Sequence, residues 1–177
     1  MRAVVGLGNP GPEYAATRHN AGFWLADALV ARWGFPPFRR GERARITEGE
    51  VGGVPVRVLK PTTYMNSSGA ALASLRADPA FNPVSDLLIV VDDFQIPTGT
   101  FRLRTEGSSG GHNGLKSIEA SLQSQAYARL RIGVGPLPEG VSDWSEYVLG
   151  PFDPEQREQL DQLMPQLVDA VEKWVRE

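Results

Sequence analysis

A continuous apolar run from Leu87 to Val91 ends at two acids, Asp92 and Asp93. A run without polar alternation is typical of a strand buried on both faces, as in the middle of a parallel sheet. Such a strand delivers the side chains that follow it to the carboxyl edge of the sheet, where α/β proteins bind their ligands. The run therefore predicts an α/β protein with a candidate site at these two acids.

The rest of the chain alternates strand and helix patterns. Strands are expected over residues 2–7, 43–50, 54–59, 100–104 and 129–134, and helices over 21–33, 68–76, 113–122 and from Asp153 onward. The pair of strands around Gly52 and Gly53 reads as a hairpin, which makes the sheet mixed. At 177 residues one core suffices. We predict a single α/β domain over residues 1–177, with helices on both faces of a mixed sheet.

Several classes of protein are excluded by composition. The chain has no cysteine, which removes disulfides, thiolate nucleophiles and cysteine-based metal sites. No window has 18 apolar residues, and the run from Arg2 to Gly6 is too short for a signal peptide. We therefore expect a cytoplasmic protein without a membrane segment.

The net charge of −3 hides an asymmetry along the chain. Residues 102–131 carry five bases and two acids, a net of +3, whereas residues 132–177 carry three bases and ten acids, a net of −7. The first segment is suited to meet phosphates. Scattered solvated charge explains these counts equally well.

Two glycine-rich motifs match the sequence signatures of well-known functional sites but lack the structural context that those sites require. The run from Gly6 to Gly11 matches the dinucleotide fingerprint, but Pro10 and Pro12 keep a helix from opening inside it. The run from Gly107 to Gly111 matches a serine-hydrolase elbow. No acid lies between its serine and the next histidine, so the chain order of such a triad is missing.

Both histidines are followed by asparagine, in His19-Asn20 and His112-Asn113, and a third asparagine is Asn66. Each histidine taken alone is more often a helix cap. Together with a strand-end carboxylate they supply a base, a group to orient it and amide donors for an oxyanion, which is what ester hydrolysis by water requires. No His-x-x-x-His pair exists, so no metal site is expected.

Six blocks of sequence together resemble the bacterial peptidyl-tRNA hydrolases. The first block is Gly-Leu-Gly-Asn-Pro-Gly from residue 6, with the following Thr-Arg-His-Asn, and the second is Lys-Pro-Thr-Thr-Tyr-Met-Asn-Ser-Ser-Gly from residue 60. The third is Asp-Asp from residue 92, and the fourth is Gly-Gly-His-Asn-Gly-Leu-Lys-Ser-Ile from residue 110. The last two are Arg-Leu-Arg-Ile-Gly from residue 129 and Tyr-Val-Leu-Gly-Pro-Phe from residue 147. They span Gly6 to Phe152, nearly the whole chain.

The resemblance implies an esterase that frees tRNA from a peptide without a metal, cofactor or covalent intermediate. It assigns three catalytic residues: His19 as the base, Asp92 as the carboxylate that orients it, and Asn113. The residues that it implies for substrate binding are Asn9, Tyr14, Asn20, Tyr64, Met65, Asn66 and His112, and those for tRNA phosphates are Arg102, Arg104 and Arg131.

The sequence departs from the family's pattern at two places. Gln95 stands where a second acid is common, and Gly135-Pro136 lacks a basic residue. The alternative to the enzyme is an RNA-binding relative without turnover. The expected partner is peptidyl-tRNA, with no membrane, no obligate protein partner and a monomeric chain.

Overall fold

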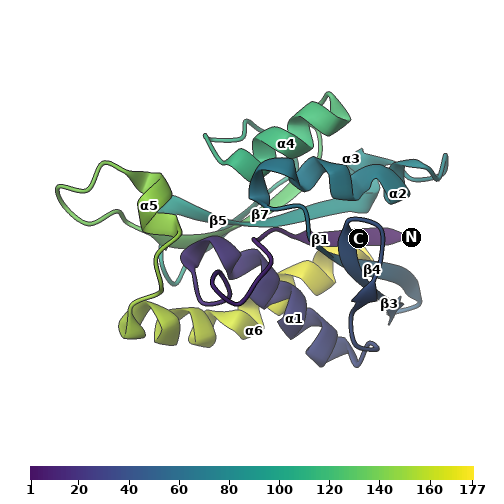
Figure 1. Cartoon of the computed structure of the whole chain (residues 1–177). Coiled ribbons are helices and arrows are strands. Elements are labelled where there is room, and N and C mark those ends of the chain that lie inside the picture. The colour runs from purple at the N-terminus through teal and green to yellow at the C-terminus, as the bar shows by residue number, and fades with distance from the viewer.

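The computed structural model describes every residue from Met1 to Glu177, and the chain forms one seven-stranded sheet flanked by helices (Figure 1). The strands are β1 (Arg2–Gly6), β2 (Arg39–Arg40), β3 (Ala44–Val51), β4 (Val54–Pro61), β5 (Leu87–Pro97), β6 (Phe101–Arg104) and β7 (Ala128–Gly135). The α-helices are α1 (Ala21–Trp33), α2 (Ala73–Arg76), α3 (Pro83–Asp86), α4 (Asn113–Leu122), α5 (Trp144–Val148) and α6 (Pro154–Arg176). Two 3-10 helices, η1 (Arg18–Asn20) and η2 (Met65–Leu72), complete the chain.

The sheet is mixed, as predicted. Its strand order is β2-β3-β4-β1-β5-β7-β6. The central strands β4, β1, β5 and β7 run parallel, whereas β2, β3 and β6 pair antiparallel with their neighbours. The carboxyl ends of β1, the middle strand, and of its parallel neighbour β5 therefore meet at one edge of the sheet.

Helices cover both faces of the sheet, which confirms the predicted layers. Alternate residues of a strand point to opposite faces. Val4 and Val90 thus belong to a core with α1 and α6, while Val5 and Ile89 belong to a second core with η2 and α4. In Figure 1 the first pair of helices lies below the sheet and α4 lies above it.

Elements with strong local patterns begin and end close to their predicted positions. Helices α1 and α4 have the predicted bounds, and α1 ends at Gly34 in the left-handed conformation that favours glycine. The predicted helix over 68–76 is present, but it consists of the end of the 3-10 helix η2 followed by α2. Gly69 of η2 packs directly on the backbone of Ser117 in α4. The short elements β2, α3 and α5 were not predicted.

A close approach of two glycines fixes α1 against the end of β1. A Cβ atom at Gly6 would collide with the carbonyl oxygen of Gly22, and one at Gly22 would collide with the backbone of Leu7. Only glycine permits this contact, which holds η1, directly before α1, beside the edge of the sheet. No helix opens between Gly6 and Gly11, in agreement with the exclusion of a dinucleotide site.

Candidate active site

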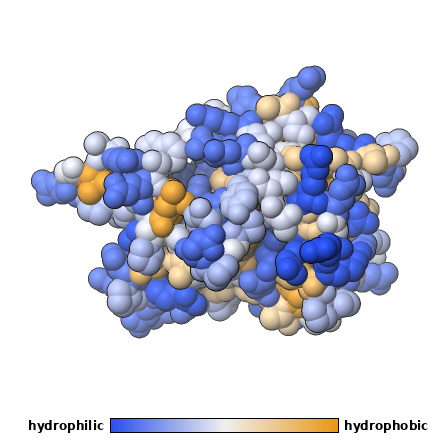
Figure 2. Space-filling view, viewed as in Figure 1, coloured by the Kyte–Doolittle hydropathy of each residue, from blue (hydrophilic) through white to orange (hydrophobic).

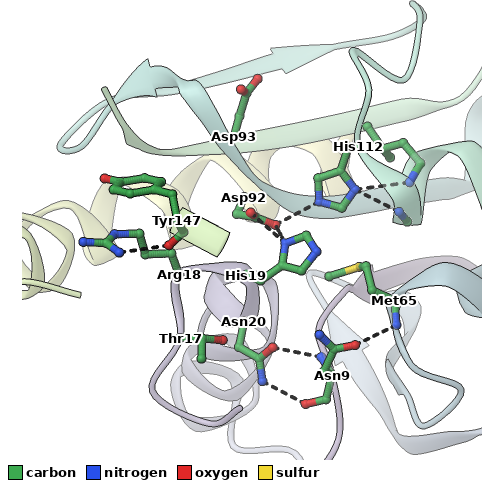
Figure 3. A network of polar contacts seen from close by, with 12 residues as sticks. Asn9, Thr17, Arg18, His19, Asn20, Met65, Asp92, Asp93, His112 and Tyr147 are labelled. Carbon is green, nitrogen blue, oxygen red and sulfur yellow. Dashed lines mark hydrogen bonds and ion pairs between the residues drawn. The ribbon is translucent and has the colours of Figure 1, made fainter. Parts of the chain in front are cut away.

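His19 and Asp92 meet at the carboxyl edge of the sheet. His19 comes from η1 and Asp92 from β5, and both side chains are buried. His19 Nδ1 lies 2.8 and 2.9 Å from the two carboxylate oxygens of Asp92 (Figure 3). Because a carboxylate only accepts, Nδ1 carries the proton and Nε2 keeps a free lone pair. The arrangement makes His19 a proton acceptor.

A second imidazole contacts the same carboxylate. His112 caps α4, and its Nδ1 accepts the backbone N–H groups of Gly114 at 3.0 Å and Leu115 at 3.3 Å. The proton of the neutral ring is therefore on Nε2, which donates to Asp92 Oδ1 at 2.9 Å. This helix cap fixes the tautomer of His112.

The ionised form of Asp92 is favoured despite its burial. Desolvation alone would raise the pKa of Asp92, but the attraction of His19 and His112 and their hydrogen bonds outweigh it. The pKa of Asp92 consequently lies well below its usual value. The carboxylate stays charged throughout the range in which a histidine base works.

The spacing of the two histidines along the sequence does not show how close they lie to each other and to Asp92 in space. The potential ligand atoms of His19, Asp92 and His112 lie within 4.8 Å of one another. A metal ligand needs a lone pair, and His112 Nδ1 already uses its own to accept two N–H groups. Ligation through Nε2 would require an imidazolate, so the three residues fit a hydrogen-bonded chain better than a metal site.

Beside His19 lies a pocket of about 290 Å³ that contains most of the predicted substrate residues. Its lining includes His19 together with Asn9, Tyr14, Tyr64, Met65, Asn66 and Asn113. The rings of Tyr14 and Tyr64 meet edge to face with their centroids 6.3 Å apart. Tyr64 has a φ of 62°, a strained value for a residue other than glycine, of the kind that concentrates at functional sites.

Asn9 is held by three hydrogen bonds, one to its side-chain amide and two to its backbone (Figure 3). Its Oδ1 accepts from the backbone N–H of Met65 at 2.8 Å, while its backbone N–H and carbonyl bond to the amide of Asn20 at 2.8 and 2.9 Å. The amide nitrogen of Asn9 is thus left to donate into the pocket.

Asn20, one of the residues predicted to bind substrate, is buried beside Asn9. It is 2% exposed, does not line this pocket, and both atoms of its amide are bonded to Asn9. The geometry makes Asn20 a support for Asn9. His112 likewise does not line the pocket and contacts Asp92 and α4 instead.

One wall of the pocket was missed by the sequence reasoning. Trp144, Ser145, Val148 and Leu149, in and just after α5, line it. The only signal was the family-like block from Tyr147 to Phe152, to which no role had been assigned.

This wall is tied to the turn that carries His19. The buried Arg18 donates to the carbonyl oxygen of Tyr147 at 3.0 Å and stacks on its ring, with the guanidinium carbon 3.9 Å from the ring centroid. Gln156 then accepts from the Arg18 guanidinium and donates to the Tyr147 hydroxyl at 2.9 Å. Arg18 therefore links the base to the pocket wall.

The basic residues of the segment 102–131 fall into two groups. Arg102 and Arg104 are exposed on β6. Arg131, paired across from Arg102, is only 15% exposed at its side chain, lies 3.6 Å from Asp93 and donates to the carbonyl oxygen of Ser108. Arg131 is thus less available to phosphate than Arg102.

Arg129 belongs to the basic segment 102–131, but it is buried, with 1% of its surface exposed. Its guanidinium donates to the carbonyl oxygens of Gly107, Ser108, Gln125 and Tyr127, which flank α4 on both sides. This charge secures the loop that leads to His112 and does not reach the surface. The hydroxyl of Ser109 in the same loop has no hydrogen bond to either imidazole and instead accepts the backbone N–H of Gly111, in agreement with the exclusion of a serine hydrolase.

The fold and the site together define a hydrolytic enzyme built on a mixed α/β sheet, with an aspartate-oriented histidine beside an asparagine-lined pocket. A family model described as peptidyl-tRNA hydrolase matches residues 3–177, and the chain belongs to this family.

Relatives and a solved structure agree with this assignment. The chain is 45% identical to a peptidyl-tRNA hydrolase of Gemmatimonas aurantiaca, over 100% of this chain and 94% of that protein. It is 46% identical to one of Roseiflexus sp., over 100% of this chain and 81% of that protein. The crystal structure of peptidyl-tRNA hydrolase from Acinetobacter baumannii is similar with a TM-score of 0.91 and 35% identity, covering 99% of this chain and 89% of that one.

Proposed function

We propose that the chain hydrolyses the ester bond of peptidyl-tRNA and so releases the peptide and a free tRNA for reuse in translation. The observation that carries the proposal is the pair formed by His19 and Asp92 beside a pocket lined by asparagines. Membership of the family supports the same substrate.

The arrangement suggests how the reaction proceeds. His19 Nε2 takes a proton from water as the water oxygen attacks the ester carbonyl carbon. The amides of Asn66 and Asn113 donate to the resulting oxyanion, and Asn9 holds the peptide carbonyl or the water. When the intermediate collapses, the bond to the ribose oxygen breaks and this oxygen receives the proton from His19. Met65, Tyr14 and Tyr64 form walls that position the substrate.

A single-turnover assay with an N-acetyl-aminoacyl-tRNA tests this function directly. The enzyme releases the N-acetylated amino acid at a rate that rises with enzyme concentration and then saturates. A non-catalytic RNA-binding relative would instead retain intact acylated tRNA, and this outcome would contradict the proposal.

We further propose that the reaction needs no metal and no cofactor, since His112 has no lone pair free for ligation. Exhaustive chelation followed by assay in metal-free buffer should leave turnover unchanged. Activity that disappears and returns with zinc, while the tRNA stays folded, would refute metal independence.

The exposed Arg102 and Arg104 are proposed to contact tRNA phosphates, with a smaller contribution from Arg131. The double variant Arg102→Ala with Arg104→Ala should raise KM for acyl-tRNA and leave cleavage of a short acyl-nucleotide nearly unchanged. Each lost phosphate contact should flatten the slope of log K against log salt by roughly 0.7 to 0.9.

A matched control for this double variant is Arg40→Ala, at the opposite end of the sheet. It should leave the salt slope as in the wild type. If the double variant also keeps the wild-type slope, these two arginines do not touch tRNA. An equal loss on both substrates would place them in the catalytic pocket instead.

No helix of the structure is both long and apolar enough to cross a membrane. We propose that the enzyme works in the cytoplasm as a monomer without an obligate protein partner. Sedimentation at micromolar concentration checks the monomer.

A further inference from the structure

A second cavity, of about 360 Å³, adjoins the catalytic pocket and shares Asn9 with it. It lies between α1 and the ends of β3 and β4, and its lining includes Phe23, Trp24, Arg45 and Lys60. Apart from Asn9 and Asn20, no residue that lines this cavity has a role in the reaction proposed above.

The strand order places this cavity opposite the tRNA contacts. Arg102 and Arg104 lie on β6 at one end of the sheet, the His19–Asp92 pair lies at β5 in the middle, and the cavity lies at β3 and β4 beyond β1. If the tRNA binds at β6 and the ester bond lies beside His19, the peptide extends from the ester in the direction away from β6. The peptide therefore passes Asn9 toward the second cavity.

The chemistry of the cavity suits a peptide of variable sequence. Phe23 and Trp24 offer apolar surface. The ammonium of Lys60 is paired with Asp27 at 2.6 Å and lies 4.3 Å from the ring centroid of Phe38, so its charge is largely compensated. The side chain of Arg45 is exposed and has no hydrogen-bond or ion-pair partner, which leaves one free positive charge at the rim. Figure 2 shows the strongly hydrophilic surface of the molecule on this side, over β3 and β4.

We propose that this cavity is a peptide subsite, which takes the residues that precede the esterified one and favours acidic over basic side chains there. The inference rests on the proposed function and extends it from the ester to the peptide chain. Three additional residues lengthen an extended peptide by about 10 Å, so a tetrapeptide reaches beyond Asn9 where a single amino acid does not.

The test compares tRNA carrying an N-acetylated tetrapeptide with the same tRNA carrying only its N-acetylated last residue. Thr62 lines the cavity, is exposed and has no side-chain hydrogen bond, so Thr62→Trp narrows the subsite without disturbing the core. This variant should lower kcat/KM for the tetrapeptide substrate by about tenfold, because the peptide residues lose their contacts with the cavity. The short substrate should change less than about twofold.

Ala80→Trp, an exposed substitution outside both cavities, is the matched control and should affect neither substrate. A loss of equal size on both substrates for Thr62→Trp would assign the cavity to tRNA or to the esterified residue. Unchanged kinetics on both would show that the peptide does not enter it. Either result overturns the subsite, whereas a wild-type enzyme that cleaves neither substrate would refute the proposed function itself.

Arg45→Ser tests the charge preference independently. With tetrapeptides that differ only in one acidic or basic residue, the wild type should favour the acidic one by about threefold, and the variant should lose this preference. A preference that survives the substitution contradicts the role of Arg45.

Discussion

Replacing His19 with alanine should lower kcat by at least about 100-fold, the usual scale for a positioned acid–base group. The reason is that His19 Nε2 carries the lone pair that accepts the proton from water, while Nδ1 is bonded to Asp92 beside the pocket. Rapid-quench measurement of ester cleavage under saturating enzyme isolates this step from substrate binding.

Binding of deacylated tRNA is the control for the His19→Ala variant. The contacts proposed for tRNA lie on β6 and at Arg131 of β7, away from the pocket beside His19, so the affinity should stay within about twofold of the wild type. A variant that keeps most of its turnover would show that His19 is only a structural histidine. A variant that loses tRNA affinity and cleavage in parallel would assign His19 to binding.

Replacing Asp92 with asparagine should reduce kcat to a similar extent, by about 100-fold or more, through the tautomer of His19. His112 must keep donating from Nε2, since α4 occupies its Nδ1. The amide oxygen of the new asparagine is therefore engaged by His112, and its NH₂ group faces His19. His19 then has to accept at Nδ1 and carry its proton on Nε2, so that the base loses its lone pair.

Asp93→Asn is the matched control for the Asp92 variant, because it makes the same change one residue along the strand. Asp93 faces Arg131 and the backbone of Gln95, away from both histidines. Its kcat on a short acyl-nucleotide should fall less than about fivefold. Intact kcat in folded Asp92→Asn would refute the orienting role, and thermal melting of each variant establishes that it is folded.

In a measurement of kcat against pH, protonation of Asp92 should cause no loss of activity near neutral pH. The pKa of Asp92 is lowered because the attraction and hydrogen bonds of the two histidines outweigh its desolvation. A carboxyl with a lowered pKa in the folded state stabilises the fold above its ordinary pKa, and this contribution is lost as the pH falls toward the lowered value. Any acidic limb of the activity profile near neutrality must therefore come from another group.

Much of the fold was predictable because its signals are local. The apolar run Leu87–Val91 predicted the central strand β5, and its end predicted that Asp92 would lie at a site. Helix α1 was indicated by its spacing and by Gly34. These patterns depend on the periodicity and conformational preferences of neighbouring residues, which a single sequence contains.

The elements without such signals were missed. Strand β2 has two residues, and α3 and α5 have four and five, too short for a hydrophobic period to appear. Helix α5 nevertheless forms a wall of the pocket, because Tyr147 is held by Gln156 and by Arg18, which lies 129 residues away along the chain. Its place at the site could not follow from its own sequence.

The sequence by itself determined the layered α/β class, the family and the residue types available for chemistry. Only the tertiary structure decided that His19 and His112, 73 residues before and 20 residues after Asp92, donate to one carboxylate, and that Asn20 supports Asn9. It also decided that the charge of Arg129 is buried against carbonyl oxygens beside α4. Local conformational preferences fix the direction in which a side chain leaves its own strand or helix. Its partners across the sheet depend instead on the strand order and on close backbone contacts such as that of Gly6 with Gly22. No local sequence pattern encodes these long-range contacts.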